Sequence, residues 1–209
     1  MSDEPEDAPD LEIPPGRVGG PFDFEALFGN RRPVEMEIGI GKGRFMLAQA
    51  EARPEVNFLG VEWSLKYLRV ARDRARRRGL GNVRLFRADA RHVLAALVPD
   101  GSLARVHVYC PDPWPKKRHR KRRLFTEETA AHLGRVLAGG GYLHVSTDVL
   151  EYFEEITTVV PAHSGLRKAV DPLFPDDGTE GRTNYEAKYV QAGRTIHRAA
   201  YTAPFRGPR

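Results

Sequence analysis

Apolar and polar positions along the chain follow two alternating patterns from residue 34 onward. Short, mainly apolar runs are typical of buried strands, and the segments between them space apolar residues as one face of a helix requires. Strands are expected at Val34–Ile38, Asn57–Val61, Val83–Phe86, Arg105–Tyr109 and Tyr142–Val145, and near Leu166–Val170 and Thr195–Ala200. Helices are expected at Arg44–Ala52, from a Ser64 cap to Gly79, at His92–Leu97, at Thr126–Leu137, and at Glu151–Val160 with its end at Pro161.

Strands that alternate with helices of this length predict β-α-β units and a mostly parallel sheet covered on both faces. A chain of 209 residues, of which 41% are hydrophobic, has room for one domain with a packed core. Ligands of such sheets bind beyond the carboxyl ends of the strands. The loops that follow the strands are therefore where we look for chemistry.

The first twenty residues fit neither pattern. Residues 1–12 contain six acidic residues and no Lys or Arg, and prolines follow at 14 and 15. Such a composition is typical of a disordered segment, so we expect a tail over residues 1–20, with a solubilising role as the default, and a single domain over residues 21–209.

The charge of the chain is distributed unevenly. The net charge is +5, but beyond residue 12 the chain has 33 basic and 22 acidic residues, which favours a polyanionic partner. Cys110 is the single cysteine, so an intrachain disulfide and a cysteine zinc site are both excluded. No apolar run approaches the ~18 residues that span a bilayer, and the acidic start does not resemble a signal peptide. We expect a cytoplasmic protein with no membrane partner.

The loop after the first expected strand is rich in glycine. Glu37 precedes Gly39, Gly41 and Gly43, which allow a sharp turn and the close approach of a ligand. A dinucleotide fold has the spacing Gly-x-Gly-x-x-Gly, but Arg44 stands at its third glycine position here. An acid at this place repels a pyrophosphate and suits a cationic or hydroxyl-rich ligand.

The next two strands also end near acidic residues. Glu62 follows the second strand, where a carboxylate can accept two hydrogen bonds from a ribose diol, and Asp89 follows the third. Each acid alone could equally cap a helix or face water. Together with the glycine loop, they favour adenosine joined to a sulfonium-bearing amino acid over a dinucleotide.

The fourth strand is followed by the segment CPDPWPKKRHRKRRL, residues 110–124. Its three alternating prolines exclude a helix and regular ladder pairing, which places Asp112 and Trp114 on a stiff loop at a strand's carboxyl end. Seven of the eight residues from 116 to 123 are Lys or Arg, a density that suits a phosphate backbone. A solvated face or a localisation signal is the alternative for the basic run. Trp114 could stack on a base, but it is expected to pack under the loop. A second cluster, Arg72, Arg74, Arg76, Arg77 and Arg78, is interpreted as the wet side of its helix.

At these residues the chain resembles the bacterial tRNA (guanine-N7-)-methyltransferase family, from about residue 33 to residue 200. PDPWPKKRHRKRRL is the most specific match, and MEIGIGKG, GVEWS, NVRLFRADA, GGYLHVSTDVLEYF and RTNYEAK occur in the family's order. The resemblance implies a Rossmann-like S-adenosylmethionine-dependent methyltransferase fold in the α/β class, with a mostly parallel seven-stranded sheet whose last strand is antiparallel. It also implies methyl transfer to N7 of a variable-loop guanine in tRNA, with S-adenosylhomocysteine as the second product.

The same resemblance implies the roles of individual residues. Asp112 would be catalytic, at the junction of cofactor and guanine. The cofactor would be held by Glu37, Gly39, Gly41, Gly43, Glu62, Asp89, Ala90 and Asp112. The substrate would be contacted by Lys116, Asp148, Thr183, Asn184, Tyr185 and Glu186. The RNA would be contacted by Arg118, His119, Arg120, Lys121, Arg122 and Arg123. The sequence departs from the family where Cys110 replaces a common phenylalanine and Asn184 a frequent lysine.

The residues themselves leave several alternatives open. Asp148 could be a helix N-cap, and Tyr185 and Glu186 could belong to a packed terminal helix. Guanine N7 has a lone pair and no proton, so Asp112 is expected to orient the base or stabilise charge rather than accept a proton. The histidines show no metal-ligand spacing, and no metal is expected.

Three other functions compete with this interpretation. They are a methyltransferase of the same fold that acts on protein or a small molecule, a non-catalytic RNA-binding protein, and a nicotinamide oxidoreductase. The basic run argues against the first, the intact glycine loop with its three acids against the second, and the glycine spacing against the third. A monomer is expected, with a dimer as the alternative.

Overall fold

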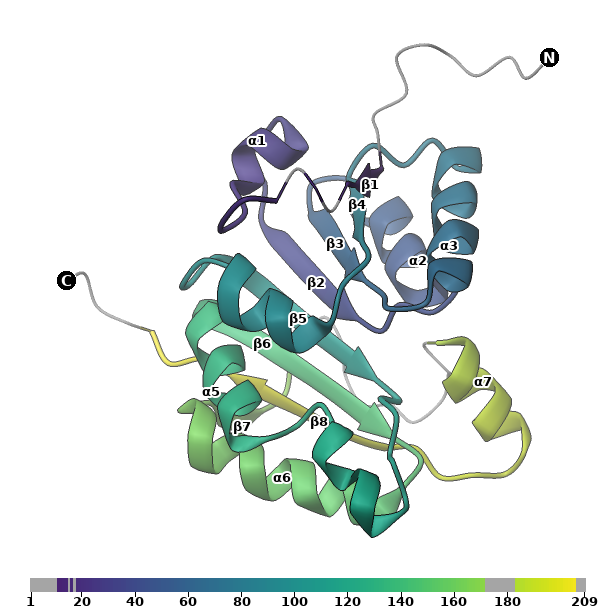
Figure 1. The fold of residues 1–209 in the computed structure, drawn as a ribbon, viewed down its shortest axis with the longest axis vertical. Helices are drawn as coiled ribbons and strands as arrows, with labels where there is room; N and C mark the ends of the chain where they lie inside the picture. Colours follow the sequence, from purple (N-terminus) through teal and green to yellow (C-terminus); the bar gives the residue numbers. More distant parts are fainter. Residues whose placement is uncertain (1–10, 15, 17, 172–182, 206–209) are drawn as a thin grey trace.

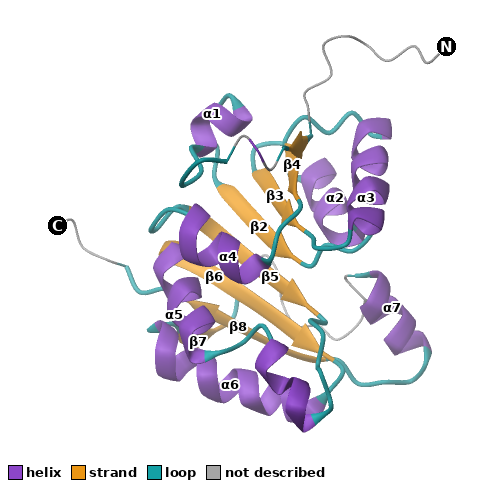
Figure 2. Ribbon diagram, viewed as in Figure 1, coloured by secondary structure: helices purple, strands orange, loops and turns teal. Residues whose placement is uncertain are grey.

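The fold is built on one twisted sheet, seen in Figures 1 and 2. The computed structural model describes residues 11–14, 16, 18–171 and 183–205. Within them, eight strands are arranged in the order β1-β4-β3-β2-β5-β6-β8-β7, and all are parallel except β8, which is antiparallel to β6 and β7. The strands are β1 (Glu12–Ile13), β2 (Val34–Ile38), β3 (Asn57–Val61), β4 (Val83–Phe86), β5 (Leu103–Tyr109), β6 (Leu137–Thr147), β7 (Arg167–Ala169) and β8 (His197–Thr202).

The predicted α/β class and the mostly parallel sheet are confirmed. Without β1, the strand order is that of the expected seven-stranded sheet with its last strand antiparallel. Strand β6 begins at Leu137, five residues earlier than expected, because the glycines at 139–141 continue the strand instead of ending the preceding helix. Gly141 is required there, since a Cβ on it would lie 2.9 Å from the carbonyl oxygen of Ala138.

The expected tail extends too far along the chain. Residues 1–10 lie outside the described residues, but Leu11 and Ile13 are buried, with 2% and 6% of their surface exposed. Glu12 and Ile13 pair in parallel with Leu85 and Phe86. The structured part therefore begins before residue 21.

Helices cover both faces of the sheet. They are α1 (Phe24–Phe28), α2 (Arg44–Ala52), α3 (Leu65–Arg77), α4 (Ala90–His92), the π-helical turn η2 (Val93–Leu97), the 3₁₀ helix η3 (Lys117–Arg122), α5 (Glu127–Val136), α6 (Leu150–Ser164) and α7 (Asn184–Gln191). Helix α1 was not expected. Helix α6 runs through Pro161, which costs one backbone hydrogen bond near its end, while Tyr152, Ile156 and Val160 bury its inner face. Ser64 occupies the N-cap of α3 but makes no side-chain capping bond.

The two faces of the sheet differ in chemistry. One face is apolar, with Met36, Val106 and Val145 buried in a core that also includes residues of α5 and α6. The opposite face is polar at its centre, because Glu35 and His107, on neighbouring strands β2 and β5, both point into it.

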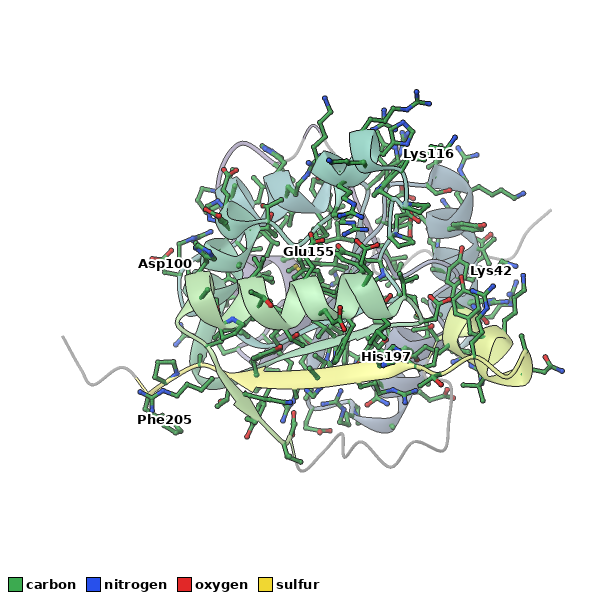
Figure 3. All side chains as sticks on the ribbon, turned by 90° about the horizontal axis from the view of Figure 1, so that it is seen from below. Lys42, Asp100, Lys116, Glu155, His197 and Phe205 are labelled. Atoms are coloured by element: carbon green, nitrogen blue, oxygen red, sulfur yellow. The ribbon has the colours of Figure 1, made fainter. Side chains whose placement is uncertain are left out.

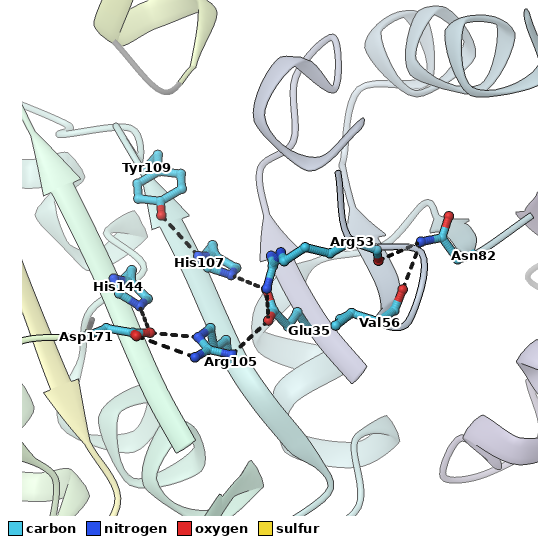
Figure 4. Close-up of polar contacts among 9 residues, drawn as sticks. All are labelled: Glu35, Arg53, Val56, Asn82, Arg105, His107, Tyr109, His144 and Asp171. Atoms are coloured by element: carbon cyan, nitrogen blue, oxygen red, sulfur yellow. Dashed lines mark hydrogen bonds and ion pairs between the residues drawn. The ribbon is translucent and has the colours of Figure 1, made fainter. Parts of the chain in front are cut away.

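A buried ionic network connects the strands on the polar face (Figure 4). Glu35 accepts hydrogen bonds from Arg53 at 2.6 Å and from the His107 ring at 3.0 Å. Burial raises the pKa of Glu35, but the bonds and charges of His107 and Arg53 outweigh it and hold that pKa at about 2. Burial lowers the pKa of His107 to about 4, so its ring is neutral and its other nitrogen can accept from the Tyr109 hydroxyl at 3.0 Å. The network thereby fixes Tyr109 at the carboxyl end of β5.

A candidate cofactor and RNA site

The glycine loop turns sharply between β2 and α2. Gly39, Gly41 and Gly43 have φ angles of 74°, 53° and 74°, a region that other residues rarely adopt. A Cβ on Gly43 would lie 3.1 Å from the Cβ of Ala71 on α3. The glycines are therefore needed both for the turn and for the close packing of the loop against α3.

Glu62 joins the end of β3 to this loop. One carboxylate oxygen accepts from the backbone N–H of Gly41 at 2.9 Å, and the other accepts from that of Ser64 at 2.8 Å. Each oxygen has a second lone pair, so the side chain is held in place and can still accept from a diol.

Glu37 is a buried carboxyl group with unused bonding capacity. Only 3% of it is exposed, and its Oε2 has no hydrogen-bond partner in the described structure. Burial, together with the charges of Glu186 and Glu62, raises its pKa to about 8, although the hydrogen bond that the N–H of Met46 donates to it acts in the opposite direction. An acid of this kind is neutral near pH 7 and would ionise beside a cation, which makes it a candidate for ligand binding.

Asp89 lies at the end of β4 in a more exposed setting. Its Oδ1 accepts from the N–H of Arg91 at 2.9 Å, which makes it the N-cap of α4, and its Oδ2 pairs with the Arg91 side chain at 2.9 Å. The hydrogen bond from Arg91 lowers the pKa of Asp89. Ala90, the first residue of α4, packs against the apolar core. Asp89 is therefore a helix cap, as one of the two alternatives for this residue predicted. Its ion pair with Arg91 is half-exposed, and such a pair is weak enough for a ligand to compete with it.

Helix α7 lies over the glycine loop, although about 140 residues separate them. A cavity of about 280 Å³ lies between the two. Its walls come from the loop, from Tyr67 and Tyr109, and from the start of α7: Gly39, Ile40, Gly41, Lys42, Tyr67, Tyr109, Thr183, Asn184, Tyr185 and Lys188. A hydrogen bond with Tyr67, burial, and the charges of Glu62 and Asp112 raise the pKa of Tyr185 to about 12. Two of the predicted cofactor residues, Gly39 and Gly41, thus share one cavity with three of the predicted substrate residues, Thr183, Asn184 and Tyr185, whereas the predicted acids Glu37, Glu62, Asp89 and Asp112 do not line it.

The four residues from 183 to 186 divide into two pairs. The Thr183 hydroxyl accepts from the N–H of Glu186 at 3.1 Å, and the Glu186 carboxylate accepts from the N–H of Thr183 at 3.0 Å, which forms a capping box for α7. Glu186 is fully buried and also accepts from Ser146 at 2.7 Å. Thr183 and Glu186 therefore hold α7 against β6, as the terminal-helix alternative proposed, while Asn184 and Tyr185 are exposed.

The proline loop holds Asp112 in front of α7. Cys110 and Trp114 have φ angles of 49° and 41°, unusual for residues with side chains and a sign of local strain. Asp112 is exposed, and its charge contributes to the raised pKa of both Tyr185 and Tyr189 on α7. The charge of Asp112 therefore acts on α7 from the loop that follows the carboxyl end of β5.

Most of the basic run, Lys117–Arg122, forms the short 3₁₀ helix η3. Trp114 packs beneath it, with the Arg122 guanidinium 4.9 Å above its ring and His119 at its edge. The predicted packing role of Trp114 is therefore confirmed. Lys116, Lys117, Arg118, Lys121 and Arg122 are exposed.

Arg123 differs from its neighbours. It is 1% exposed, donates to the Pro113 carbonyl at 2.8 Å, pairs with Glu155 and lies over the Tyr152 ring. Its assignment as an RNA contact is therefore wrong, because its charge is used to tie the proline loop to α6. Arg120, in contrast, is half-exposed and pairs with Glu151 at 2.7 Å.

Asp148 is not the N-cap of α6, because Val149 occupies that position. Its carboxylate pairs with Arg194 at 2.6 Å, and only 9% of its side chain is exposed. The Arg194 guanidinium lies 4.9 Å above the Tyr189 ring. Asp148 therefore holds the end of the α7 region against β6 in this structure.

The described residues also bear on metal binding and on membrane insertion. In the ranges that the structure describes, no three His, Cys, Asp or Glu side chains gather closely enough to hold a metal ion. Across the same residues, no helix combines the length and the apolar character that crossing a bilayer requires.

Comparisons with known proteins agree with this geometry. Residues 31–199 match a family model described as "Putative methyltransferase". A tRNA (guanine-N(7)-)-methyltransferase of Alkalilimnicola ehrlichii is 39% identical over 89% of this chain and 78% of its own length. The protein of the same name from Geobacter metallireducens is 35% identical over 90% of both chains. Among solved structures, the antibiotic-resistance methyltransferase Kmr has a TM-score of 0.59 at 16% identity, over 88% of this chain and 93% of that one.

Proposed function

Because the chain belongs to the bacterial tRNA (guanine-N7-)-methyltransferase family, we propose that it transfers the methyl group of S-adenosylmethionine to guanine N7 in tRNA at the edge formed by Glu37, Glu62 and Asp112. The observation that carries the proposal is the cavity between the glycine loop and α7. The buried and incompletely bonded carboxyl group of Glu37 lies in β2, two residues before that loop. The variable-loop guanine is proposed as the target within tRNA.

The residues present fit S-adenosylmethionine, which supplies an electrophilic methyl group on a sulfonium sulfur. Glu62 has free lone pairs for the ribose hydroxyls. Glu37 is proposed to bind the cationic amino-acid end, because a nearby cation compensates the ionisation that burial opposes. The backbone of Gly39 and Gly41 allows close approach, and Asp89 with Ala90 is proposed to complete the adenosine side.

Asp112 is proposed to orient the guanine. The N7 lone pair attacks the methyl carbon directly, so no proton has to be removed. A carboxylate can accept from the N–H groups on the Watson–Crick edge of the base, and it also stabilises the positive charge that develops on the ring. Asn184, Tyr185 and Lys116 are exposed on the same edge and are proposed as further substrate contacts.

The exposed cations of η3 are proposed to hold the phosphates that flank the target base. The monomer stays a prediction. A tRNA substrate supports a cytoplasmic location.

The test is incubation of the protein with methyl-labelled S-adenosylmethionine and unmodified tRNA, followed by nucleoside analysis. The expected product is 7-methylguanosine. Asp112→Ala is expected to abolish turnover while tRNA still binds. Label in protein or on another base would overturn the proposed function, and full activity of the Asp112 variant would remove that residue from the mechanism.

A further inference from the structure

A second hollow lies on the other side of the glycine loop from the cofactor cavity. It has a volume of about 380 Å³ and is formed where the first turns of α2 meet the outer face of α3. Gly43 and Leu47 form its base, and its rim carries four guanidinium groups, from Arg44, Arg74, Arg77 and Arg78. We call these four residues and the space between them the arginine hollow. The sequence did not predict it, because Arg44 is thirty residues away from the others.

The charges of the arginine hollow are poorly compensated by the protein. Arg44 and Arg77 are exposed and form no ion pair or hydrogen bond with any residue that the structure describes. Arg74 donates to the Lys42 carbonyl at 3.0 Å, and Arg78 lies 3.3 Å from the exposed Glu51. Among the residues that the structure describes, no carboxylate lines the hollow.

Another arginine of the same helix behaves differently. Arg72 is paired with Asp73 at 2.9 Å and with Glu12 at 3.3 Å, so its charge is compensated on both sides. Exposure to solvent alone does not explain this difference between two sides of α3. One side pairs Arg72 with acidic residues, while the other brings three arginines at the end of α3 together with Arg44 of α2 around a hollow. Like charges that are held close together repel each other, and a bound anion removes this cost.

The shape and position of the hollow suit a phosphate of a nucleic acid. A guanidinium group can bind a phosphate through two parallel hydrogen bonds, one to each of two phosphate oxygens. Lys42 borders both spaces, since it lines the cofactor cavity and its carbonyl is bonded to Arg74. Lys42 and Lys116 lie on the same side of the molecule, the side where α7 is found (Figure 3). An RNA whose base enters beside Asp112 therefore has cations available on both sides of the cavity.

We propose that the arginine hollow binds a backbone phosphate of the tRNA and is a second RNA contact, separated from η3 by the cofactor cavity and α7. The inference rests on the proposed function for the identity of the RNA. It replaces the interpretation of these arginines as a solvated helix face.

The test compares two double variants that remove the same charge. Arg44→Gln/Arg77→Gln changes the hollow without touching the Arg74 bond to the glycine loop. Arg31→Gln/Arg32→Gln is the matched control, because these residues precede β2 at the opposite end of the parallel strands and bond to Glu25 and the Pro54 carbonyl. The dissociation constant for unmodified tRNA is measured from 50 to 300 mM salt, and that for S-adenosylhomocysteine at one salt concentration.

In the hollow variant, tRNA affinity is expected to fall about tenfold and the slope of log affinity against log salt to decrease by about 2, since each lost phosphate contact removes roughly one unit. Its affinity for S-adenosylhomocysteine is expected to be unchanged. Equal slopes in the hollow variant and the wild type, or equal losses in both variants, would overturn the proposal. If the double variant unfolds, Arg77→Gln alone, on an exposed helix surface, is expected to lower the slope by about 1.

Titration with inorganic phosphate separates the two sources of the anion. Loss of phosphate binding in the hollow variant, with tRNA affinity unchanged, would show a site for free anions and would also overturn the proposal. The proposed function fails separately, if the wild-type protein binds tRNA but produces no 7-methylguanosine, and the comparison of salt slopes remains valid in that case.

Discussion

Replacement of Glu37 by glutamine tests whether this buried acid exists for the cofactor. The pKa of Glu37 is raised from 4.5 to about 8, mainly by burial. The folded protein therefore prefers the protonated form, and the stability associated with it is present below pH 4.5 and lost as the pH rises toward 8. At pH 7 the loss amounts to about 3 kcal/mol of unfolding free energy, from about 2.5 pH units at 1.36 kcal/mol each.

Glutamine has nearly the same shape and no charge, so Glu37→Gln removes this pH dependence. The variant without cofactor is expected to gain about 3 kcal/mol over the wild type between pH 4.5 and pH 7, measured by urea unfolding at both values. Other titrating groups are the same in both proteins and cancel in the difference. An unchanged difference between the two pH values would refute the reasoning about burial.

The same variant is expected to lose cofactor affinity. In the wild type, a bound ammonium or sulfonium group lowers the pKa of Glu37, so binding at pH 7 releases close to one proton, which the variant does not release. Calorimetry of S-adenosylhomocysteine binding in two buffers of different ionisation enthalpy measures this difference. Equal affinity and equal proton release in both proteins would show that Glu37 does not face the cofactor.

Two further predictions concern the supports of the site. Arg123→Gln is expected to destabilise the protein by at least ~2 kcal/mol, because it breaks the buried contacts to Pro113, Glu155 and Tyr152. The control variant Lys121→Gln is expected to leave the melting temperature unchanged and to weaken only tRNA binding. Similar melting temperatures for the two variants would contradict the inward position of Arg123. The pKa of Glu35 is lowered to about 2, so this residue contributes stability that is present above pH 4.5 and lost as the pH falls toward 2. The difference in unfolding free energy between the wild type and Glu35→Gln is therefore expected to shrink by an amount on the order of 3 kcal/mol over that range. A constant difference in acid unfolding would argue against the network.

The sequence predicted three strands to the residue, Val34–Ile38, Asn57–Val61 and Val83–Phe86, and missed the first two residues of β5, which begins at Leu103. The three strands lie in the interior of a parallel sheet, where burial on both faces favours apolar residues and turn residues mark the ends. Strand β1 could not be found in this way, because two residues carry no pattern and depend on pairing with β4. Glu35 and Glu37 alternate with apolar residues in β2, a signal of a polar face that our interpretation of the strand did not use.

The sequence predicted the loops that form the site. It did not predict which residues hold those loops in place. Burial distinguishes Arg123 from the other cations of its run, but nothing in a row of similar charges indicates which one turns inward. The arginine hollow depends on the packing of α2 against α3, which brings Arg44 to residues thirty positions away. Thr183 and Glu186 show the capping-box spacing, so their structural role could have been predicted from local chemistry.

The most direct test of the central claim is a crystal structure of the protein with bound S-adenosylhomocysteine. The account predicts that the ribose hydroxyls lie within hydrogen-bond distance of Glu62, that the ammonium group lies beside Glu37, and that the sulfur faces the Asp112 loop under α7. A ligand bound elsewhere, or a sulfur that faces away from Asp112, would contradict it.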